Sequence, residues 1–344
     1  MGNTSVEPRL LEISGLSVSF YTNRGVVRAV RNLDLGIDRG ETLALVGESG
    51  CGKSVTAQSI NRLVPCPPGK IEAGRVLFEG VDLLGLTEKE VRHYRGERIS
   101  MIFQEPMTSL NPVFKIGQQI ADVFITHHRL SRREAFARAV ELLRVVKIPA
   151  PDRRAHSYPH QLSGGMRQRV MIAMALASPK PGLLIADEPT TALDVTIQAQ
   201  ILELLKELQR QIAMGILLIT HDMGVVAETA DRVIVMYAGR KVEEGPVRAV
   251  VNSPAHPYTM GLLNSLPSNV KYRNARRLEA ISGTVPDMIG VGEGCPFAGR
   301  CGYRGDICDR VFPEPWLAFS EDDTRQRAWC HFAESIRKGE RWRN

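Results

Sequence analysis

The stretch of the chain best suited to chemistry is a glycine-rich segment that ends in a lysine and a serine. It reads Gly47-Glu48-Ser49-Gly50-Cys51-Gly52-Lys53-Ser54 and fits the pattern G-x-x-x-x-G-K-[ST]. The apolar run 42–46 before it predicts a strand, so the segment should connect a strand to a helix. Glycines let successive backbone N–H groups converge on a phosphate, and the helix N-terminus adds the positive end of its dipole. Lys53 would reach the β- and γ-phosphates of a nucleoside triphosphate, and the Ser54 hydroxyl would bind Mg²⁺.

Polar side chains follow three further apolar runs that predict strands. They are Gln104 after residues 99–103, Asp187 and Glu188 after residues 183–186, and His221 after residues 216–220. In α/β proteins, functional polar groups gather at the carboxyl ends of parallel strands. Asp187 can hold Mg²⁺ through water, and Glu188 can orient or deprotonate an attacking water. A neutral His221 can hydrogen-bond the γ-phosphate or that water.

A second group of small residues predicts another anion-binding helix N-terminus. It reads Leu162-Ser163-Gly164-Gly165-Met166 and opens a helical pattern through residues 170–177. Further along, residues 190–194 end at Asp194 and lead into a predicted helix. One face of that helix is apolar and consists of Ile197, Ile201, Leu204 and Leu208. As a lone motif the first group could be only a helix cap, but its place after a phosphate loop favours a binding role.

The elements that position these residues follow from periodicity. Residues 9–46 read as strands and turns, with four short runs at 11–13, 16–20, 26–30 and 33–37. Phe20, with Tyr21 beside it, is a candidate for stacking on adenine, or equally a core residue at the end of a strand. A helix is expected over 53–63, and residues 113–180 read as helical, with a capping box at 131–134. This order of strands and helices predicts an α/β fold.

Composition excludes some classes of protein. The 344 residues are 43% hydrophobic and 24% charged, and the net charge of +6 is spread along the chain. A solvated surface explains that charge better than a nucleic-acid site. No run approaches the ~18 apolar residues of a membrane span, and residues 1–6 lack the apolar region of an export signal. We therefore expect a cytosolic protein, or one held on a membrane only through partners.

Six motifs follow one another along the chain: the phosphate loop at 47–54, Gln104, residues 162–166, Asp187-Glu188, Asp194 and His221. In this order they resemble the nucleotide-binding subunit of ABC transporters over about residues 9–267. The resemblance implies a P-loop NTPase with a RecA-like core, an antiparallel β subdomain and a helical subdomain at about 105–180. It implies ATP and Mg²⁺ as ligands, with Gln104 as the residue that senses the γ-phosphate, contacts Mg²⁺ and faces the membrane subunits. Residues 162–166 would be the signature that faces the ATP of a partner subunit. Met166 departs from the usual glutamine, with little expected loss.

Three stretches narrow the resemblance to the importers of dipeptides, oligopeptides and nickel, and most to the D-type ATPase of dipeptide importers. They are residues 104–112, Tyr158-Pro159-His160-Gln161 and His256-Pro257-Tyr258-Thr259. This branch implies a second ATPase subunit, two transmembrane permease subunits and an external solute-binding protein, with no nucleic-acid partner. It implies a place on the cytoplasmic face of the inner membrane. Peptides are the expected solute, with nickel, glutathione, opines and oligosaccharides as alternatives.

The branch also carries a C-terminal extension, here about residues 268–344, which contains most of the cysteines. Cys295, Cys301, Cys308 and Cys330 crowd this part of the chain. Four thiolates can hold a [4Fe–4S] cluster or a structural zinc ion, and the spacing alone does not choose. The resemblance favours the iron–sulfur cluster. Little regular structure is expected in this segment, so its order should depend on the metal.

Three other classes of protein fit the sequence less well. ABC ATPases of DNA repair carry a long coiled-coil insertion and those of translation carry two ATPase halves, and this chain has neither. An iron–sulfur module with a vestigial nucleotide site is disfavoured because Lys53, Asp187, Glu188 and His221 are all present. A GTPase is disfavoured because the chain lacks an N-K-x-D motif.

Overall fold

A computed structural model describes residues 9–104, 109–178, 181–191, 193–265, 281–318 and 325–339. Contacts divide the chain into two compact units, which are considered one at a time. The first unit comprises residues 1–36, 42–84 and 219–344, and the second comprises residues 37–41 and 85–218.

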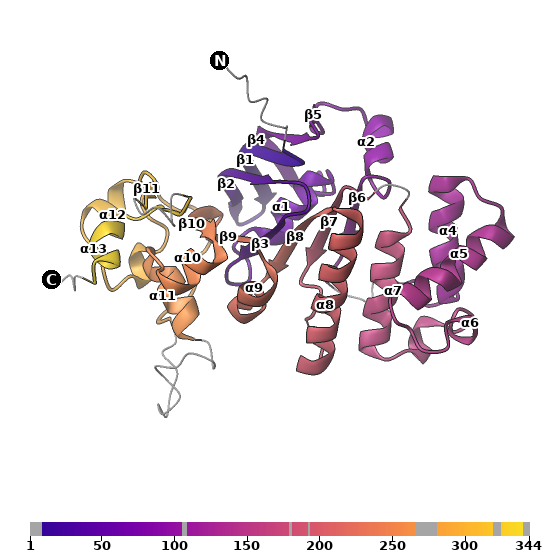
Figure 1. Ribbon diagram of the computed structural model, residues 1–344. Helices are drawn as coiled ribbons and strands as arrows, with labels where there is room; N and C mark the ends of the chain where they lie inside the picture. The colour runs from indigo at the N-terminus through magenta and orange to yellow at the C-terminus, as the bar shows by residue number, and fades with distance from the viewer. Residues whose placement is uncertain are drawn as a thin grey trace, which may run out of the picture. The chain divides into compact units, whose positions relative to one another are not determined.

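One sheet of the first unit contains its N-terminal strands (Figure 1). In spatial order these are β2 (Gly25–Ile37), β1 (Leu11–Thr22), β4 (Gly69–Phe78) and β5 (Val81–Asp82). The sequence predicted four short strands before residue 38, whereas the structure has two long ones. β1 continues through an irregularity between Ser14 and Ser17, where Gly15 adopts φ 63°. A glycine at a bulge lets a strand bend without ending, which periodicity alone does not reveal.

The first unit also supplies strands of a mixed sheet, in the order β11, β12, β10, β9, β3. Their bounds are Trp316–Leu317, Arg327–Ala328, Arg240–Pro246, Arg232–Tyr237 and Thr42–Val46. β3 runs parallel to β9, and β9 pairs antiparallel with β10. The helices of this unit are α1 (Lys53–Ile60), α9 (Met223–Thr229), α10 (Val247–Asn252), α11 (Pro257–Asn264), α12 (Ile307–Arg310) and α13 (Ala333–Arg337), with a 3₁₀ turn at Ala298–Arg300. Apolar residues of β3, β9 and α11 form one core with Phe297 of the C-terminal segment.

The second unit combines parallel strands with most of the longer helices. β6 (Ile99–Ile102) pairs parallel with β7 (Leu183–Asp187), and β8 (Gly215–Thr220) is the next neighbour in the order. The helices are α2 (Glu88–Tyr94), α4 (Ile116–His128), α5 (Arg132–Val145), α6 (Pro151–Arg154), α7 (Gly164–Leu176) and α8 (Val195–Ile212), with a 3₁₀ turn at Pro159–Gln161. The capping box at Ser131 is confirmed, since Ser131 and Glu134 cap each other at the start of α5. The α/β prediction is likewise confirmed.

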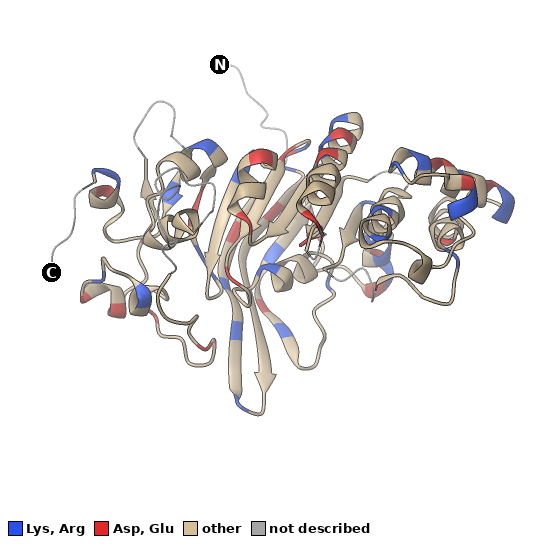
Figure 2. Cartoon of the chain, turned by 90° about the horizontal axis from the view of Figure 1, so that it is seen from below, with Lys and Arg blue, Asp and Glu red and all other residues tan. Residues whose placement is uncertain are grey.

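Charged side chains are dispersed along the described chain. Figure 2 shows lysine and arginine interspersed with aspartate and glutamate on helices and strands. The net charge of +6 is therefore not gathered on one element. None of the helices in the described ranges is long and apolar enough to cross a membrane.

Candidate nucleotide site

The glycine-rich segment connects β3 to α1, as predicted, and two of its glycines are required by the backbone. Gly47 has φ 155° and Gly52 has φ 106°. A Cβ on Gly47 would lie 2.3 Å from the carbonyl oxygen of Met236, and one on Gly52 would lie 2.3 Å from that of Ala29. Both contacts are far shorter than van der Waals distance and involve backbone, which cannot move aside. The loop therefore packs against β2 and β9 as closely as only glycine permits.

The loop ends at the N-terminus of α1, where the first backbone N–H groups of the helix have no partner within the helix itself. Gly52 is the N-cap and provides no side-chain cap, and the first turn contains no acidic residue. Ser54, half-buried, is the second residue of the helix. The dipole and the exposed amides of such an end favour bound phosphate.

Lys53 is held inside the loop with only 5% of its surface exposed. Its ammonium donates to the carbonyl oxygens of Gly47 at 2.7 Å and Glu48 at 3.0 Å. Cys51 lies behind it, fully buried, with Sγ 3.7 Å from Nζ. Burial raises the pKa of the Cys51 thiol, and the nearby ammonium only partly offsets this. Cys51 is therefore a neutral packing residue, while Lys53 carries the positive charge of the loop.

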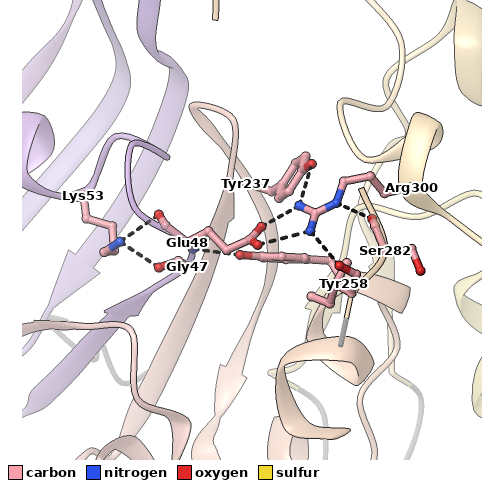
Figure 3. Close-up of polar contacts among 8 residues, drawn as sticks. Gly47, Glu48, Lys53, Tyr237, Tyr258, Ser282 and Arg300 are labelled. Atoms are coloured by element: carbon pink, nitrogen blue, oxygen red, sulfur yellow. Dashed lines mark hydrogen bonds and ion pairs between the residues drawn. The ribbon is translucent and has the colours of Figure 1, made fainter. Parts of the chain in front are cut away.

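The Glu48 side chain turns away from Lys53 and toward the C-terminal part of the chain (Figure 3). Its carboxylate accepts hydrogen bonds from Arg300, and its backbone N–H donates to the hydroxyl of Tyr258. The sequence did not identify Arg300, and it marked Tyr258 only as part of a branch-specific stretch. No sequence pattern around Arg300 indicates that its partner is Glu48, far away in the chain.

His221 directly follows β8 and is exposed, in the predicted position at the end of a strand. The next residue, Asp222, caps α9 by accepting from the N–H groups of Gly224 and Val225. The cap fixes the turn that carries His221, so the imidazole is placed by the start of a helix.

In the second unit, the structure brings Gln104 and Glu188 together at the ends of β6 and β7. The Gln104 amide Nε2 donates to Glu188 Oε2 at 3.2 Å, and Thr191 Oγ1 donates to the same oxygen at 2.7 Å. The backbone of Glu188 has φ 48°, in the left-handed region that residues other than glycine rarely adopt. Such backbone conformations cluster at functional sites. Asp187, the last residue of β7, is buried. Residues 105–108 of the predicted loop and Ala192 lie outside the described residues.

Ser163 caps α7, as the sequence indicated, and its hydroxyl accepts from the N–H of Met166. Gly164 and Gly165 form the first turn, and a Cβ on Gly165 would lie 2.6 Å from the Ile197 side chain of α8. Asp194 is the N-cap residue of α8. This helix start therefore contacts the next helix through Gly165, and Leu162, just before the cap, is buried.

The predicted site residues are divided between the two units. Residues 47–54 and His221 belong to the first unit, while Gln104, Asp187 and the signature belong to the second. The aromatic candidates are also in the first unit. Phe20 is half-buried on β1, and the hydroxyl of Tyr21, which is 53% exposed, donates to Glu72. The adenine-stacking role of either residue stays a prediction.

The four C-terminal cysteines line a single cavity of about 10 Å³ in the first unit. Those residues are Cys295, Cys301, Cys308 and Cys330, and all are free thiols. Burial raises the pKa of Cys295 and of Cys330 to about 12, so these thiols are neutral. Within the described ranges, no three His, Cys, Asp or Glu side chains are grouped so that they could hold a metal ion. The thiols share a cavity without forming a ligand set, and the [4Fe–4S] cluster stays a prediction.

His256 also lines this cavity and is almost completely buried. Its Nδ1 accepts from the N–H of Tyr258, which makes His256 the N-cap of α11. Its Nε2 has no hydrogen-bond partner among the described residues. Because burial lowers the pKa of His256 to about 3, the ring is neutral and Nε2 carries its proton.

Comparison with known proteins agrees with this geometry. The family described as "ABC transporter" matches residues 30–191, and the family "Oligopeptide/dipeptide transporter, C-terminal region" matches residues 242–308. The oligopeptide transport ATP-binding protein OppD of Bacillus subtilis is 56% identical over 87% of this chain and 83% of its own. The dipeptide transport ATP-binding protein DppD of the same organism is 52% identical over 89% of this chain and 90% of its own.

Solved structures give the same result. A dimeric, ADP- and Pi-bound structure of the ATP-binding cassette MJ0796 is 30% identical and has a TM-score of 0.62, covering 69% of this chain and 99% of the other. CbiO1 from Clostridium perfringens, part of the CbiONQ transporter complex, is 29% identical with a TM-score of 0.61, covering 71% of this chain and 91% of the other. The predicted resemblance is confirmed, and so is the ABC ATPase fold. The chain belongs to the ATP-binding proteins of ABC transporters, in the oligopeptide and dipeptide transport branch.

Proposed function

We propose that this chain is the ATP-hydrolysing subunit of a binding-protein-dependent importer of dipeptides or oligopeptides. One observation carries the hydrolytic role: Gln104 and Thr191 both donate to the carboxylate of Glu188, directly after the buried Asp187. A carboxylate held in this way is oriented to accept a proton from water. The match of residues 242–308 to the oligopeptide/dipeptide C-terminal region supports peptides as the solute.

The roles of the remaining residues follow from their chemistry. The amides of residues 47–54 and Lys53 would bind the phosphates, and Ser54, Asp187 and Gln104 would bind Mg²⁺. His221 would hydrogen-bond the γ-phosphate or the attacking water, and Phe20 or Tyr21 would stack on adenine. Mg²⁺ and Lys53 would neutralise the charge of the phosphates, and Glu188 would accept a proton from a water that lies in line with the leaving group.

Substitution of Glu188 by glutamine tests this assignment. Glutamine keeps the shape and the hydrogen bonds from Gln104 and Thr191 but cannot take a proton. We expect MgATP binding to persist and hydrolysis to fall roughly 10²- to 10⁴-fold, the usual contribution of a general base. Glu141→Gln, at an exposed ion pair with Arg138 on α5, is the matched control and should hydrolyse ATP normally. Hydrolysis by Glu188→Gln at the rate of the control would remove Glu188 from its role.

We also propose that the subunit works as a pair. The signature at residues 162–166 would face the ATP of a second, related ATPase subunit, in a heterodimer. Two transmembrane permease subunits, contacted near Gln104, and an external solute-binding protein would complete an importer, with this subunit on the cytoplasmic face of the inner membrane. Purification of the tagged chain from membranes should recover two multi-span proteins and a second ATPase. Recovery of nucleic acid or ribosomes instead would contradict transport.

The proposed domains are an ATPase domain at residues 9–267, with a helical subdomain at about 105–180, and a C-terminal extension at 268–344. Within the extension, we propose that Cys295, Cys301, Cys308 and Cys330 hold a [4Fe–4S] cluster, with zinc as the alternative. Support comes from their position around one cavity. That cavity has room for about one water-sized sphere, so a cluster would require the side chains to rotate outward. Bound metal would replace the thiol protons and cross-link the segments that carry the four cysteines.

Anaerobic purification distinguishes the two metals. A brown protein with broad visible absorbance, lost in Cys301→Ser, is the expected result. A colourless preparation that contains zinc would overturn the cluster.

A further inference from the structure

Arg300 of the C-terminal segment (residues 281–318) and Tyr258 of α11 hold one residue of the phosphate loop, Glu48, from two sides (Figure 3). Arg300 Nη1 and Nη2 donate to the two carboxylate oxygens of Glu48 at 2.7 and 3.2 Å, a bidentate ion pair. The hydroxyl of Tyr258 accepts from the backbone N–H of Glu48 at 2.8 Å. Because both the side chain and the backbone of Glu48 are engaged, its carboxylate has one defined direction, away from Lys53.

Arg300 is itself fixed by two carbonyl groups of its own segment and by Tyr237 of β9. Its Nε donates to the carbonyl oxygen of Ser282 at 2.9 Å, Nη2 donates to that of Ile281 at 3.3 Å, and Nη1 donates to the hydroxyl of Tyr237 at 3.2 Å. Its side chain is only 7% exposed. A guanidinium with all three nitrogens engaged in a buried site has little freedom to follow the carboxylate elsewhere.

The aromatic residues behind this pair are also rigid. Tyr258 is fully buried and packs edge-on against Tyr237, with ring centroids 4.7 Å apart. Phe297 packs against both rings, at 5.2 Å from Tyr237 and 5.4 Å from Tyr258. Such contacts favour one arrangement of the rings and so hold both hydroxyls in place.

The placement of Glu48 matters because it is a negative charge in a loop built for anions. Lys53 and the amides of α1 favour bound phosphate, whereas a free carboxylate in the same loop would repel it or compete for Lys53. The ion pair with Arg300 neutralises that carboxylate and holds it on the far side of the loop from Lys53. The loop can then present a net positive field to a triphosphate.

We propose that Arg300 is a positioning residue for nucleotide binding, which keeps the Glu48 carboxylate out of the phosphate site. The C-terminal segment is by this means a part of the ATP site. The inference rests on the proposed function, because it requires that residues 47–54 bind the phosphates of ATP. Arg300 does not touch the nucleotide and acts only through Glu48.

The test compares affinities of the full chain for Mg²⁺ with a non-hydrolysable ATP analogue, measured by calorimetry. Arg300→Gln should weaken binding roughly 3- to 30-fold, the usual range for a residue that acts through another. The double variant Arg300→Gln, Glu48→Gln should recover most of that loss, because the carboxylate that Arg300 restrained is gone. Arg304→Gln is the control, since Arg304 lies in the same segment but pairs with Asp309 at the surface, and it should bind normally.

Recovery in the double variant separates positioning from folding, because a merely structural role of Arg300 would leave the second substitution neutral or harmful. Arg300→Lys keeps the charge without the bidentate geometry and should lose less affinity than Arg300→Gln, which provides a test if the glutamine variant does not fold. Normal affinity in both Arg300 variants, or no recovery in the double variant, would overturn the inference. Failure of the wild-type chain and of Arg304→Gln to bind the analogue would instead refute the proposed function itself.

Discussion

Glu243 on β10 is an ionisable group in a completely buried position, and its stability contribution should depend on pH. Its Oε1 accepts from the N–H of Ala255 and from the amide of Gln326, and its Oε2 accepts from the N–H of His256. Burial is the dominant influence, and it raises the pKa of Glu243 from 4.5 to about 7. The carboxyl group is therefore neutral in the folded protein at pH values where it is ionised in the unfolded chain.

The sign of the effect follows from that difference. A glutamate with a raised pKa stabilises the fold fully below pH 4.5, and the stabilisation is lost as the pH rises toward 7. Between pH 5 and pH 8 the loss amounts to about 2.5 kcal/mol for this single group. In Glu243→Gln the group cannot ionise, while the acceptor oxygen and the size of the side chain are kept. From pH 5 to pH 8, the free energy of unfolding of the wild-type protein should therefore fall by about 2.5 kcal/mol relative to that of the variant.

Urea unfolding followed by tryptophan fluorescence suits this measurement. All three tryptophans of the chain, at 316, 329 and 342, are C-terminal, and the Trp329 N–H bonds to the carbonyl of Val242, beside Glu243. The fluorescence thus reports on the unit that contains the substitution. Comparison of wild type with variant at each pH cancels the titration of the other groups.

Glu334→Gln provides the control. Glu334 forms an exposed ion pair with Lys338 on α13, and such pairs contribute less than about 1 kcal/mol. The free energy of unfolding of Glu334→Gln should differ from that of the wild type by a nearly constant amount from pH 5 to pH 8. If the Glu243→Gln difference is equally constant, or grows in the opposite direction, burial does not keep Glu243 neutral and the reasoning fails.

Three other substitutions test the local geometry. Gly52→Ala should destabilise the first unit by about 2–5 kcal/mol in urea unfolding, because its Cβ would clash with the Ala29 carbonyl at a positive φ, and an unchanged midpoint would contradict this. Ser163→Ala removes the cap of α7 and should cost roughly 0.5–2 kcal/mol, whereas Ser163→Asn should cost less. Gln119→Leu removes three hydrogen bonds of a buried amide: Gln119 Oε1 accepts from the N–H of Asn111, and Nε2 donates to the carbonyl oxygens of Asn111 and Phe114. The loss should lower the free energy of unfolding by about 2–4 kcal/mol, and a decrease below about 1 kcal/mol would show that water replaces these bonds.

The sequence was most informative where a function is carried by neighbouring residues. Residues 47–54 and the capping box at 131–134 are contiguous, so their local geometry follows from residue type and spacing. The same holds for Ser163 at the start of α7. The strand ends at Gln104 and Glu188 were predicted one by one, and their meeting followed from the rule that parallel strands end at the same edge of a sheet.

Long-range contacts were not predictable in this way. Arg300 and Glu48 are 252 residues apart, and neither residue type nor periodicity links an arginine at the end of a 3₁₀ turn to a phosphate loop. The cysteine spacing likewise gave no geometry, because short irregular segments bring the four residues to their cavity. β1 was divided into two strands because Gly15 at a bulge resembles a turn in the sequence.

The discontinuity of the first unit has a consequence for the newly made chain on the ribosome. The second unit is nearly continuous, from 85 to 218, whereas the first needs residues 219–344 to be complete. β3 pairs with β9 in the register Leu43 to Arg232, so the strand before the phosphate loop waits for a partner made much later. At ~5–20 residues per second, that wait lasts roughly 10–40 seconds. During synthesis, the nascent phosphate-loop strand therefore stays without β9 for this time, and a strand that lacks its partner exposes an edge on which chains can aggregate.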